Sequence, residues 1–418
     1  MTTAVVIFGI SYFLIATGRI PHVLIAVLGA ISMVFLGVMT EHEALSHVNL
    51  EVVLLLAGMM SLANVFARTG AFEWAAIKAA QVVRGDGFLT LCLLCVITAV
   101  ASAFLDNVTV VVLAVPITLS ICRMLDVQPI PFLLAQVFAS NIGGVSTIVA
   151  DPPNIIIAAE ADIGFLDFML NAGPVGIAGM LVLIGMLYLW FRKSTVTTEE
   201  SRATVMQRNA AAAITDFVLL KKCIVVFTFT VVGFLVHDLL HVGPAFVAVA
   251  SATVLILISR IDPHEVLEQV EWTTLAFFVG LFILVGGLEE TGVTVIVREW
   301  LVDVSGGSDR NLAFLLIWFG GVTSAIVDNV PFTATMVEVV RGVSNDDLGI
   351  SPLWWALALG ADLGGNATIV GASANVIVVN LARARGHSIS FLHFFRYGAV
   401  ISALTLLLST AYLWLRYF

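Results

Sequence analysis

Apolar runs of membrane-spanning character alternate along the chain with short polar breaks. They fall at roughly 4–17, 22–39, 52–66, 88–105, 108–121, 132–158, 172–191, 223–236, 243–259, 273–288, 312–327, 330–340, 353–381 and 396–415. A helix needs about 20 apolar residues to cross a hydrocarbon core of ~30 Å, so several runs are too short to cross unaided. Two others, 132–158 and 353–381, are long but interrupted by Gly, Asn and Asp. The pattern predicts an all-α polytopic membrane protein that contains broken helices.

The composition supports the membrane class. Of the 418 residues, 60% are apolar and only 11% are charged, and the mean hydropathy is +1.05. Soluble domains carry about 25% charged residues. The first apolar run has neither a basic n-region nor a small-residue cleavage site, so we interpret it as the first span. We expect interfacial aromatic belts that include Trp354, Trp355, Trp414 and Tyr417.

Several functional classes find no support in the sequence. The net charge is −10 and there is no basic patch, so no nucleic-acid partner is expected. The chain contains no nucleophile elbow, Walker loop or GxGxxG motif, so we expect neither an enzyme nor an ATP-driven pump, and no cofactor. No His or Cys cluster completes a metal site around the four cysteines, which are Cys92, Cys95, Cys122 and Cys223.

The two halves of the chain repeat. One long polar stretch, 192–222, separates a first repeat, 1–191, from a second, 223–418. Two landmarks recur 222 positions later: Thr69-Gly70 as Thr291-Gly292, and Asp106-Asn107 as Asp328-Asn329. Three more recur 221 positions later: Gly143-Gly144 as Gly364-Gly365, Thr147 as Thr368, and Asn154 as Asn375. Matching landmarks in the same order indicate an internal duplication.

The basic residues orient these repeats. We place the stretch 192–222 in the cytoplasm as a linker, because it is rich in Lys and Arg. Of the 19 basic residues, only Arg298, Arg310, Arg341 and Arg416 then lie outside, which is a strong positive-inside bias. The hairpin 88–121 would enter from the cytoplasmic side and the hairpin 312–340 from the outer side. The sequence therefore predicts two inverted-topology repeats, as in many secondary transporters.

Both hairpins are expected to be re-entrant. As helices, 108–121 would span about 21 Å and 330–340 less, short of the hydrocarbon thickness. We also expect Pro116 and Pro331 to interrupt these limbs.

An aspartate marks each hairpin tip. Asp106 lies within SAFLDNVTVVVL and Asp328 within SAIVDNVPFTAT. A carboxylate at membrane depth costs roughly 2.5–3.5 kcal/mol on insertion scales, unless it faces a hydrated cavity, binds a cation or stays protonated. Asp106 and Asp328 are therefore the candidates for proton or Na⁺ coupling. The alternative is that each caps a broken helix end, and the two roles can coexist.

The broken runs carry further candidates. Residues 140–154 read SNIGGVSTIVADPPN, and residues 361–375 read ADLGGNATIVGASAN. Irregular backbone at membrane depth is tolerated only where it is buried in protein or lines a cavity, and glycine pairs permit an unwound turn. A break made only for helix packing is the alternative. The predicted substrate- and ion-binding residues are Asp106, Asn107, Asn141, Gly143, Gly144, Thr147, Asp151, Asn154, Asp328, Asn329, Asp362, Gly364, Gly365, Asn366, Thr368, Ser373 and Asn375.

The two broken runs differ in their acids. Asn141 aligns with Asp362, and Asp151 aligns with Ala372. Each half therefore holds one acid at its hairpin tip and one acid without a counterpart. This asymmetry favours a coupled carrier over a simple pore.

The runs SAFLDNVTVVVLAVPITL and SNIGGVSTIVADPPNIIIA resemble the ion transporter superfamily, in particular its branch of arsenite permeases, melanosomal P proteins and NhaD-type Na⁺/H⁺ antiporters. The resemblance extends over nearly the whole chain. It implies two scaffold-plus-transport repeats around a central site, elevator-like alternating access, and a homodimer in the cytoplasmic membrane.

The resemblance and the Asn- and Thr-rich site favour proton-coupled export of arsenite or antimonite. Arsenous acid is an uncharged trihydroxy solute near neutral pH, so amide and backbone groups suit its hydroxyls. Tight thiolate capture by Cys92 or Cys95 would oppose its release. A Na⁺/H⁺ antiporter, a carrier of carboxylates or other anions, and a passive channel are the alternatives. The sequence leaves open whether an ATPase subunit energises such a permease.

Overall fold

The computed structural model describes residues 1–17, 20–344 and 350–418, which form helices and no strand. The first half contains α1 (Thr2–Thr17), α2 (His22–Phe35), α3 (Glu41–Ser46), α4 (Leu50–Ala67), α5 (Ala71–Val82), α6 (Gly87–Ser102), α7 (Asn107–Leu125), α8 (Pro129–Gly144), the 3₁₀ turn η1 (Ile148–Ala150), α9 (Pro152–Glu160) and α10 (Phe165–Phe191). The linker contains α11 (Glu199–Gln207) and η2 (Ala210–Ala213). The second half contains α12 (Phe217–Leu240), α13 (Pro244–Ser259), α14 (Pro263–Glu268), α15 (Trp272–Glu290), α16 (Val293–Ser305), α17 (Asp309–Ile326), α18 (Asn329–Arg341), α19 (Pro352–Gly364), η4 (Gly365–Ala367), α20 (Ser373–Ala384) and α21 (Phe391–Tyr417).

The helices have the lengths and composition of membrane spans. Six of the described helices, α4, α7, α10, α12, α15 and α21, are long and apolar enough to cross a bilayer. Four shorter apolar helices, α1, α2, α6 and α13, accompany them. The expected all-α membrane class is confirmed.

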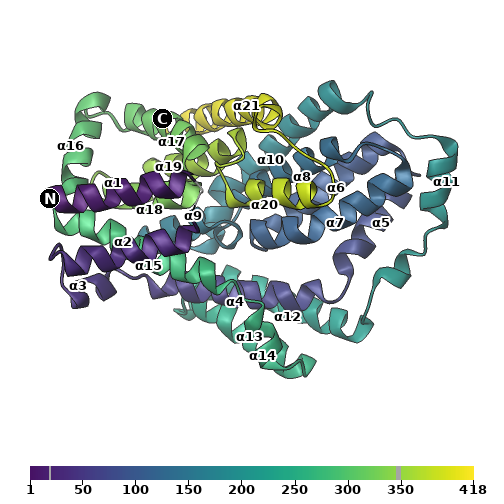
Figure 1. Cartoon of the computed structure of the whole chain (residues 1–418), viewed down its shortest axis with the longest axis horizontal. Helices are drawn as coiled ribbons and strands as arrows, with labels where there is room; N and C mark the ends of the chain where they lie inside the picture. The colour runs from purple at the N-terminus through teal and green to yellow at the C-terminus, as the bar shows by residue number, and fades with distance from the viewer. Residues whose placement is uncertain (18–19, 345–349) are drawn as a thin grey trace.

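The two interrupted runs are broken helices, as expected. In the first half, α8 ends at Gly144, and the chain is extended at Thr147 and Asp151 before α9 begins. In the second half, α19 ends at Gly364, and the chain is extended at Thr368 and Ala372 before α20 begins. Figure 1 shows these four helices close together in the middle of the molecule. The same irregular backbone path therefore occurs once in each half, and the two breaks lie close together in the middle of the molecule.

The expected interruptions at the prolines are wrong. Helix α7 continues through Pro116 to Leu125, so it has 19 residues and spans about 28 Å. Pro331 lies in the first turn of α18, where a missing N–H leaves no helical carbonyl unpaired. The breaks lie instead at the tips, where α7 and α18 begin. Re-entrance of the hairpins stays a prediction, because α7 is long enough to cross.

The linker is shorter than the predicted 192–222. Helix α12 begins at Phe217 because the Asp216 carboxylate accepts hydrogen bonds from two backbone N–H groups in its first turn, at 2.8 and 2.9 Å. Figure 1 shows α11 of the linker at the right-hand end of the longest axis, and α3 and α16 at the left-hand end. The placement of the linker in the cytoplasm stays a prediction.

The predicted interfacial role of Trp354 and Trp355 is wrong. Both side chains are 1% exposed, because α19 is buried among α8, α9, α17, α18 and α21. The Trp355 ring packs edge-on against Phe168 of α10, with the ring centroids 5.4 Å apart. Trp414, by contrast, is 48% exposed.

A pair of glycines with left-handed backbone starts α5 and α16 in the two halves. The φ angles are 75° at Gly70 and 72° at Gly292. A Cβ on Gly70 would lie 1.9 Å from the carbonyl oxygen of Ala213 in η2, whereas a Cβ on Gly292 would meet no described atom within 4 Å. The two positions share the conformation and differ in their surroundings.

We predict that Gly70→Ala destabilises the protein more than Gly292→Ala. Left-handed backbone costs a non-glycine residue ~1–2 kcal/mol, and Gly70→Ala must also displace η2. Thermal unfolding of the purified protein in detergent measures both effects. Equal shifts in the two variants would contradict the close contact at Gly70.

Candidate functional site

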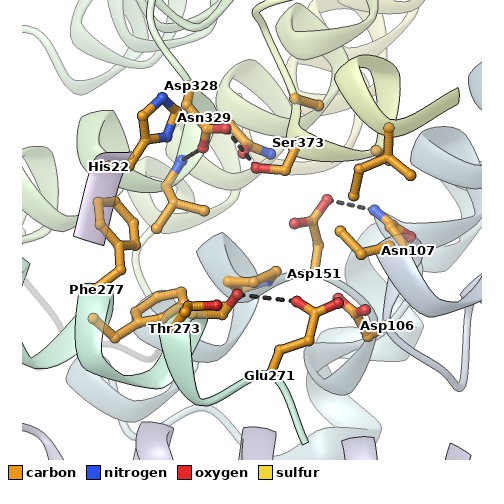
Figure 2. Close-up of a pocket in the computed structure, with 18 of the residues that line it drawn as sticks. His22, Asp106, Asn107, Asp151, Glu271, Thr273, Phe277, Asp328, Asn329 and Ser373 are labelled. Atoms are coloured by element: carbon orange, nitrogen blue, oxygen red, sulfur yellow. Dashed lines mark hydrogen bonds between the residues drawn. The ribbon is translucent and has the colours of Figure 1, made fainter. Parts of the chain in front are cut away.

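A cavity of about 610 Å³ lies where the hairpin tips meet the broken helices. Its walls come mainly from the N-terminal ends of α2, α7, α15, α18 and α20 and from the residues that precede α9. Figure 2 shows Asp151 between two groups, with Asp328, Asn329 and Ser373 on one side and Asp106 and Glu271 on the other. The cavity therefore joins side chains from both halves.

Asp106 and Asp328 cap the helices that follow them. One carboxylate oxygen of Asp106 accepts from the N–H of Thr109 at 2.9 Å and lies 3.1 Å from the hydroxyl of the same residue. Asp328 accepts from the N–H of Val330 at 3.1 Å and from the hydroxyl of Ser373 at 2.8 Å. Both side chains are buried. Each carboxylate is the acceptor in these bonds, and an ionised carboxylate is the stronger acceptor.

Asp151 has neighbours from both halves. The side-chain amide of Asn107 donates to its Oδ2 at 2.7 Å, and Figure 2 shows this bond. Asn329 of the second hairpin tip also lies beside it, and Asp362 is close enough to repel its charge. Asp151 and Asp362 therefore form the inner pair of acids in the site.

Asn141 links the two halves directly. Its Nδ2 donates to Oδ1 of Asn366 at 3.0 Å and to Oδ1 of Asn375 at 2.9 Å. All three side chains are buried. These bonds fix the end of α8 against η4 and α20.

Asn154 and Asn375 hold the broken backbone in the two halves. The amide of Asn154 donates to the carbonyls of Gly144 and Thr147 at 3.1 and 3.2 Å. The amide of Asn375 makes the matching bonds, both 2.8 Å long, to the carbonyls of Gly365 and Thr368. These carbonyls have lost their helical partners at the breaks, so the amides satisfy them.

Thr147 and Thr368 tie each break to its hairpin. The hydroxyl of Thr147 donates to the carbonyl of Ala103. The hydroxyl of Thr368 donates to the carbonyl of Ala325 at 2.6 Å. Both carbonyls precede a tip aspartate by three residues, so movement of a broken helix would move the tip beside it.

Asp362 lies behind the cavity wall. Its side chain is 1% exposed and lies beside the amides of Asn154 and Asn329. Neither carboxylate oxygen makes a well-formed hydrogen bond to any described residue. A buried carboxyl group without such bonds is costly if it is ionised.

The glycine pairs act differently from our expectation. None of Gly143, Gly144, Gly364 and Gly365, all within the described part of the chain, has a positive φ. A Cβ on Gly143 would lie 2.3 Å from the carbonyl oxygen of Ala99 in α6, and one on Gly364 would lie 2.4 Å from a backbone atom of α17. The glycines let each broken helix approach its hairpin closely. Helix α8 includes both of its glycines, whereas Gly365 already lies in the 3₁₀ turn that follows α19.

The predicted residues fall into two layers. Those that line the cavity are Asp106, Asn107, Asn141, Asp151, Asp328, Asn329 and Ser373. The remaining ones are buried behind them and shape the wall: Gly143, Gly144, Thr147, Asn154, Asp362, Gly364, Gly365, Asn366, Thr368 and Asn375.

Sequence reasoning missed Glu271 and His22. Glu271 precedes α15 and lies beside Asp106, and Thr274 donates to its carboxylate at 3.0 Å (Figure 2). His22 begins α2 and lies near Asp328. The repeat contained one signal for Glu271. It aligns with Asn49, and the two residues directly precede the equivalent helices α15 and α4.

The cavity is acidic. It is lined by Asp106, Asp151, Glu271 and Asp328, and His22 is the one basic side chain among its described lining residues. None of the four cysteines is among those residues either. The arrangement suits a proton, another cation or a neutral solute better than a free anion.

Apolar spans, paired broken helices and a polar cavity between them are the features of a multi-pass membrane transporter. The sequence profile of the citrate transporter (CitMHS) family matches residues 12–360. The chain belongs to this family, within the ion transporter superfamily, so the resemblance is confirmed. The family also agrees with the expectation that the protein is not an enzyme.

Similar proteins support the same class. The uncharacterized transporter Rv2684 of Mycobacterium tuberculosis is 43% identical over 423 residues, which cover 99% of this chain and 98% of that protein. The human P protein is 31% identical over 503 residues, which cover 99% of this chain and 59% of that protein. The crystal structure of the Alcanivorax borkumensis YdaH transporter has a similar fold, with a TM-score of 0.59 over 88% of this chain and 86% of that chain at 16% identity.

We predict that Asn375→Ala destabilises the protein strongly. It removes the amide that serves two buried carbonyls, and each buried acceptor left unpaired costs ~1–3 kcal/mol. Asn380→Ala, at an exposed position of the same helix, should change the stability by only about 0.5 kcal/mol or less. Thermal unfolding in detergent compares the two variants, and similar melting temperatures would contradict the bridging role of Asn375.

Proposed function

We propose that the protein is a secondary active transporter of the cytoplasmic membrane that exports a small uncharged solute, driven by inward proton movement. The observation that supports this is the acidic cavity at two broken helices, with no Lys or Arg among its described lining residues. A carboxyl group in such a cavity can take up and release the driving ion. Freed backbone and amide groups can bind the solute.

Arsenite is the solute that we propose first, with antimonite as its chemical analogue. Oδ1 of Asn107 and Oδ1 of Asn141 have no hydrogen-bond partner among the described residues, and both side chains line the cavity. These oxygens can accept hydrogen bonds from the hydroxyls of arsenous acid. None of the four cysteines is among the described lining residues, so binding would not require a thiolate bond that opposes release.

Na⁺/H⁺ antiport is a second candidate. Besides Asn107 and Asn141, Asn154 leaves its Oδ1 and Asp362 leaves both carboxylate oxygens without partners among the described residues. Amide and carboxylate oxygens are the ligands that hard cations prefer. If these oxygens bind Na⁺, the protein would transport Na⁺ in exchange for protons.

Citrate is a third solute, because the family is described as citrate transporters. A free citrate anion would bring its carboxylates into a cavity lined by four acidic side chains and one histidine. Like charges brought together in this way are unfavourable. The cavity therefore favours citrate less than a neutral solute.

The two ends of α15 bear different cavities. The cavity of the site reaches Glu271 and Thr274 at the N-terminal end, and a second cavity of about 350 Å³ reaches Glu289 and Glu290 at the C-terminal end. The helix has 19 residues, so its ends are about 28 Å apart. The positive-inside orientation makes the N-terminal end cytoplasmic. We propose that the two cavities are the inner and outer entrances to one transport path.

Arg341 lines the second cavity and pairs with three carboxylates there. Its guanidinium pairs with Glu160 of α9 at 2.7 Å, with Glu289 of α15 at 2.6 Å and with Glu338 of its own helix at 2.5 Å. The bonds to Glu160 and Glu289 join three helices in the wall of this cavity. We propose that this network is the outer gate, closed while the site is open toward the cytoplasm.

We predict that everted membrane vesicles with an acidic lumen accumulate arsenite, and that an uncoupler abolishes the accumulation. Asp106→Asn should lower the initial rate roughly tenfold or more, which corresponds to about 1.4 kcal/mol, because it removes a charge from the cavity and weakens the cap of α7. Asp309→Asn, at an exposed position at the start of α17, is the matched control and should transport normally.

The same vesicles separate the alternatives. Absence of arsenite accumulation with well-expressed wild-type protein would contradict the arsenite proposal. A change of lumenal pH on addition of Na⁺ or Li⁺ would then support antiport, and accumulation of labelled citrate would support the third solute. Flux without accumulation would indicate a passive channel.

We predict that Arg341→Gln opens the second cavity, because three carboxylates then repel one another without a cation between them. A single thiol introduced by Ala334→Cys in a cysteine-free background reports the opening, since Ala334 is buried in the wall of that cavity. A membrane-impermeant maleimide applied from the outer face should label it several times faster.

Three further variants sharpen this test. Glu289→Gln breaks a bond between helices and should also speed labelling, whereas Glu338→Gln breaks a bond within α18 and should change it little. Arg310→Gln removes an exposed charge of the second half outside the cavity and should have no effect. Unchanged labelling in Arg341→Gln, or equal labelling in all four variants, would contradict the gate.

A further inference from the structure

The repeat shows what kind of group the position of Asp362 requires. Its counterpart in the first half, Asn141, donates a hydrogen bond from its side chain to Oδ1 of Asn375. Asn375 can accept this bond because its Nδ2 is already engaged by the backbone of its own broken helix. The position thus supplies a donor to the asparagine of the opposite half.

The first half has the matching acceptor, Asn154, but no described residue donates a hydrogen bond to it. Asn154, the counterpart of Asn375, engages the backbone with its Nδ2 in the same way. Its Oδ1 is buried and has no partner among the described residues. Asp362, at the position equivalent to Asn141, lies beside Asn154, and an ionised carboxylate has no hydrogen to donate.

We propose that Asp362 is protonated in this conformation, that its O–H donates to Oδ1 of Asn154, and that Asp362 carries the coupling proton. This inference deepens the proposed function. The protonation of Asp362 does not depend on that function, whereas the coupling role of the proton does. One proton on Asp362 supplies the missing donor and removes the charge of a side chain that is 1% exposed and makes no well-formed hydrogen bond to the described residues. It also removes the repulsion from Asp151, the acid that faces it.

Asp106 and Asp328 suit this role less well. Both accept hydrogen bonds from backbone N–H groups and hydroxyls, and such bonds are strongest to an ionised carboxylate. These bonds favour the ionised form of both tip carboxylates, whereas neither oxygen of Asp362 makes a well-formed hydrogen bond to a described residue. Asp151 lines the cavity and lies next to Asp362, so water in the cavity can exchange a proton with Asp362 through it.

Asp362→Asn imitates the protonated residue, because its amide can donate to Oδ1 of Asn154 as Asn141 donates to Asn375. We expect the variant to unfold at the wild-type temperature or higher, whereas Asp362→Ala, which lacks a donor, should unfold at a lower temperature. We also expect proton-driven accumulation of arsenite to be lost in Asp362→Asn while exchange of arsenite across the membrane without a gradient is retained.

Infrared spectroscopy detects the proton itself. The purified wild-type protein should show a carboxylic-acid C=O band that shifts in D₂O and is missing from Asp362→Asn, but is present in the control variant Asp309→Asn. Identical bands in wild type and Asp362→Asn would overturn the proposal. So would an Asp362→Asn variant less stable than Asp362→Ala.

These readouts separate this inference from the proposed function. The infrared band and the two unfolding temperatures require no transported solute, so they decide the protonation of Asp362 even if arsenite does not move. Failure of transport with a normal band would reject the solute and keep the proton site. Normal proton-driven accumulation by Asp362→Asn would reject the coupling role of Asp362 and keep the transporter.

Discussion

The structure depends on pairing the backbone groups that two helix breaks expose at membrane depth. The carbonyls at the breaks belong to buried residues, so each one left unpaired would cost the fold free energy. Asn154 and Asn375 meet this requirement with the same pair of bonds in each half. Once the breaks are stabilised in this way, the hairpin tips and a polar cavity can lie between them.

The two halves are alike in their backbone and differ in their acids. Asn141 is neutral and cross-links the halves, whereas Asp362 occupies the same position with a group that can change its charge. Asp151 has no acidic counterpart and lies between the tips. A similar backbone with different acids gives the two halves of the site different chemical roles, as we propose for the coupling proton and the solute.

Much of the site could be predicted from the sequence, because polar residues inside apolar runs need a reason to be there. The Asp-Asn tips and the asparagines around the breaks belong to this class. Local rules failed where packing decided: Pro116 is accommodated inside α7, and Trp354 is buried by helices distant in sequence. Glu271 and His22 were missed because polar residues at span ends are common, and only the tertiary fold brings them to the tips.

The most direct test of the account is internal pH in proteoliposomes that contain the purified protein and start without any ion gradient. Imposing an arsenite gradient with the membrane potential clamped should drive protons in the opposite direction to arsenite, so solute movement alone should change the internal pH. The account predicts this change in wild type and its absence in Asp362→Asn, although arsenite still crosses. Arsenite movement by the wild type without any change in pH would contradict the claim that the acids of this site couple the solute to protons.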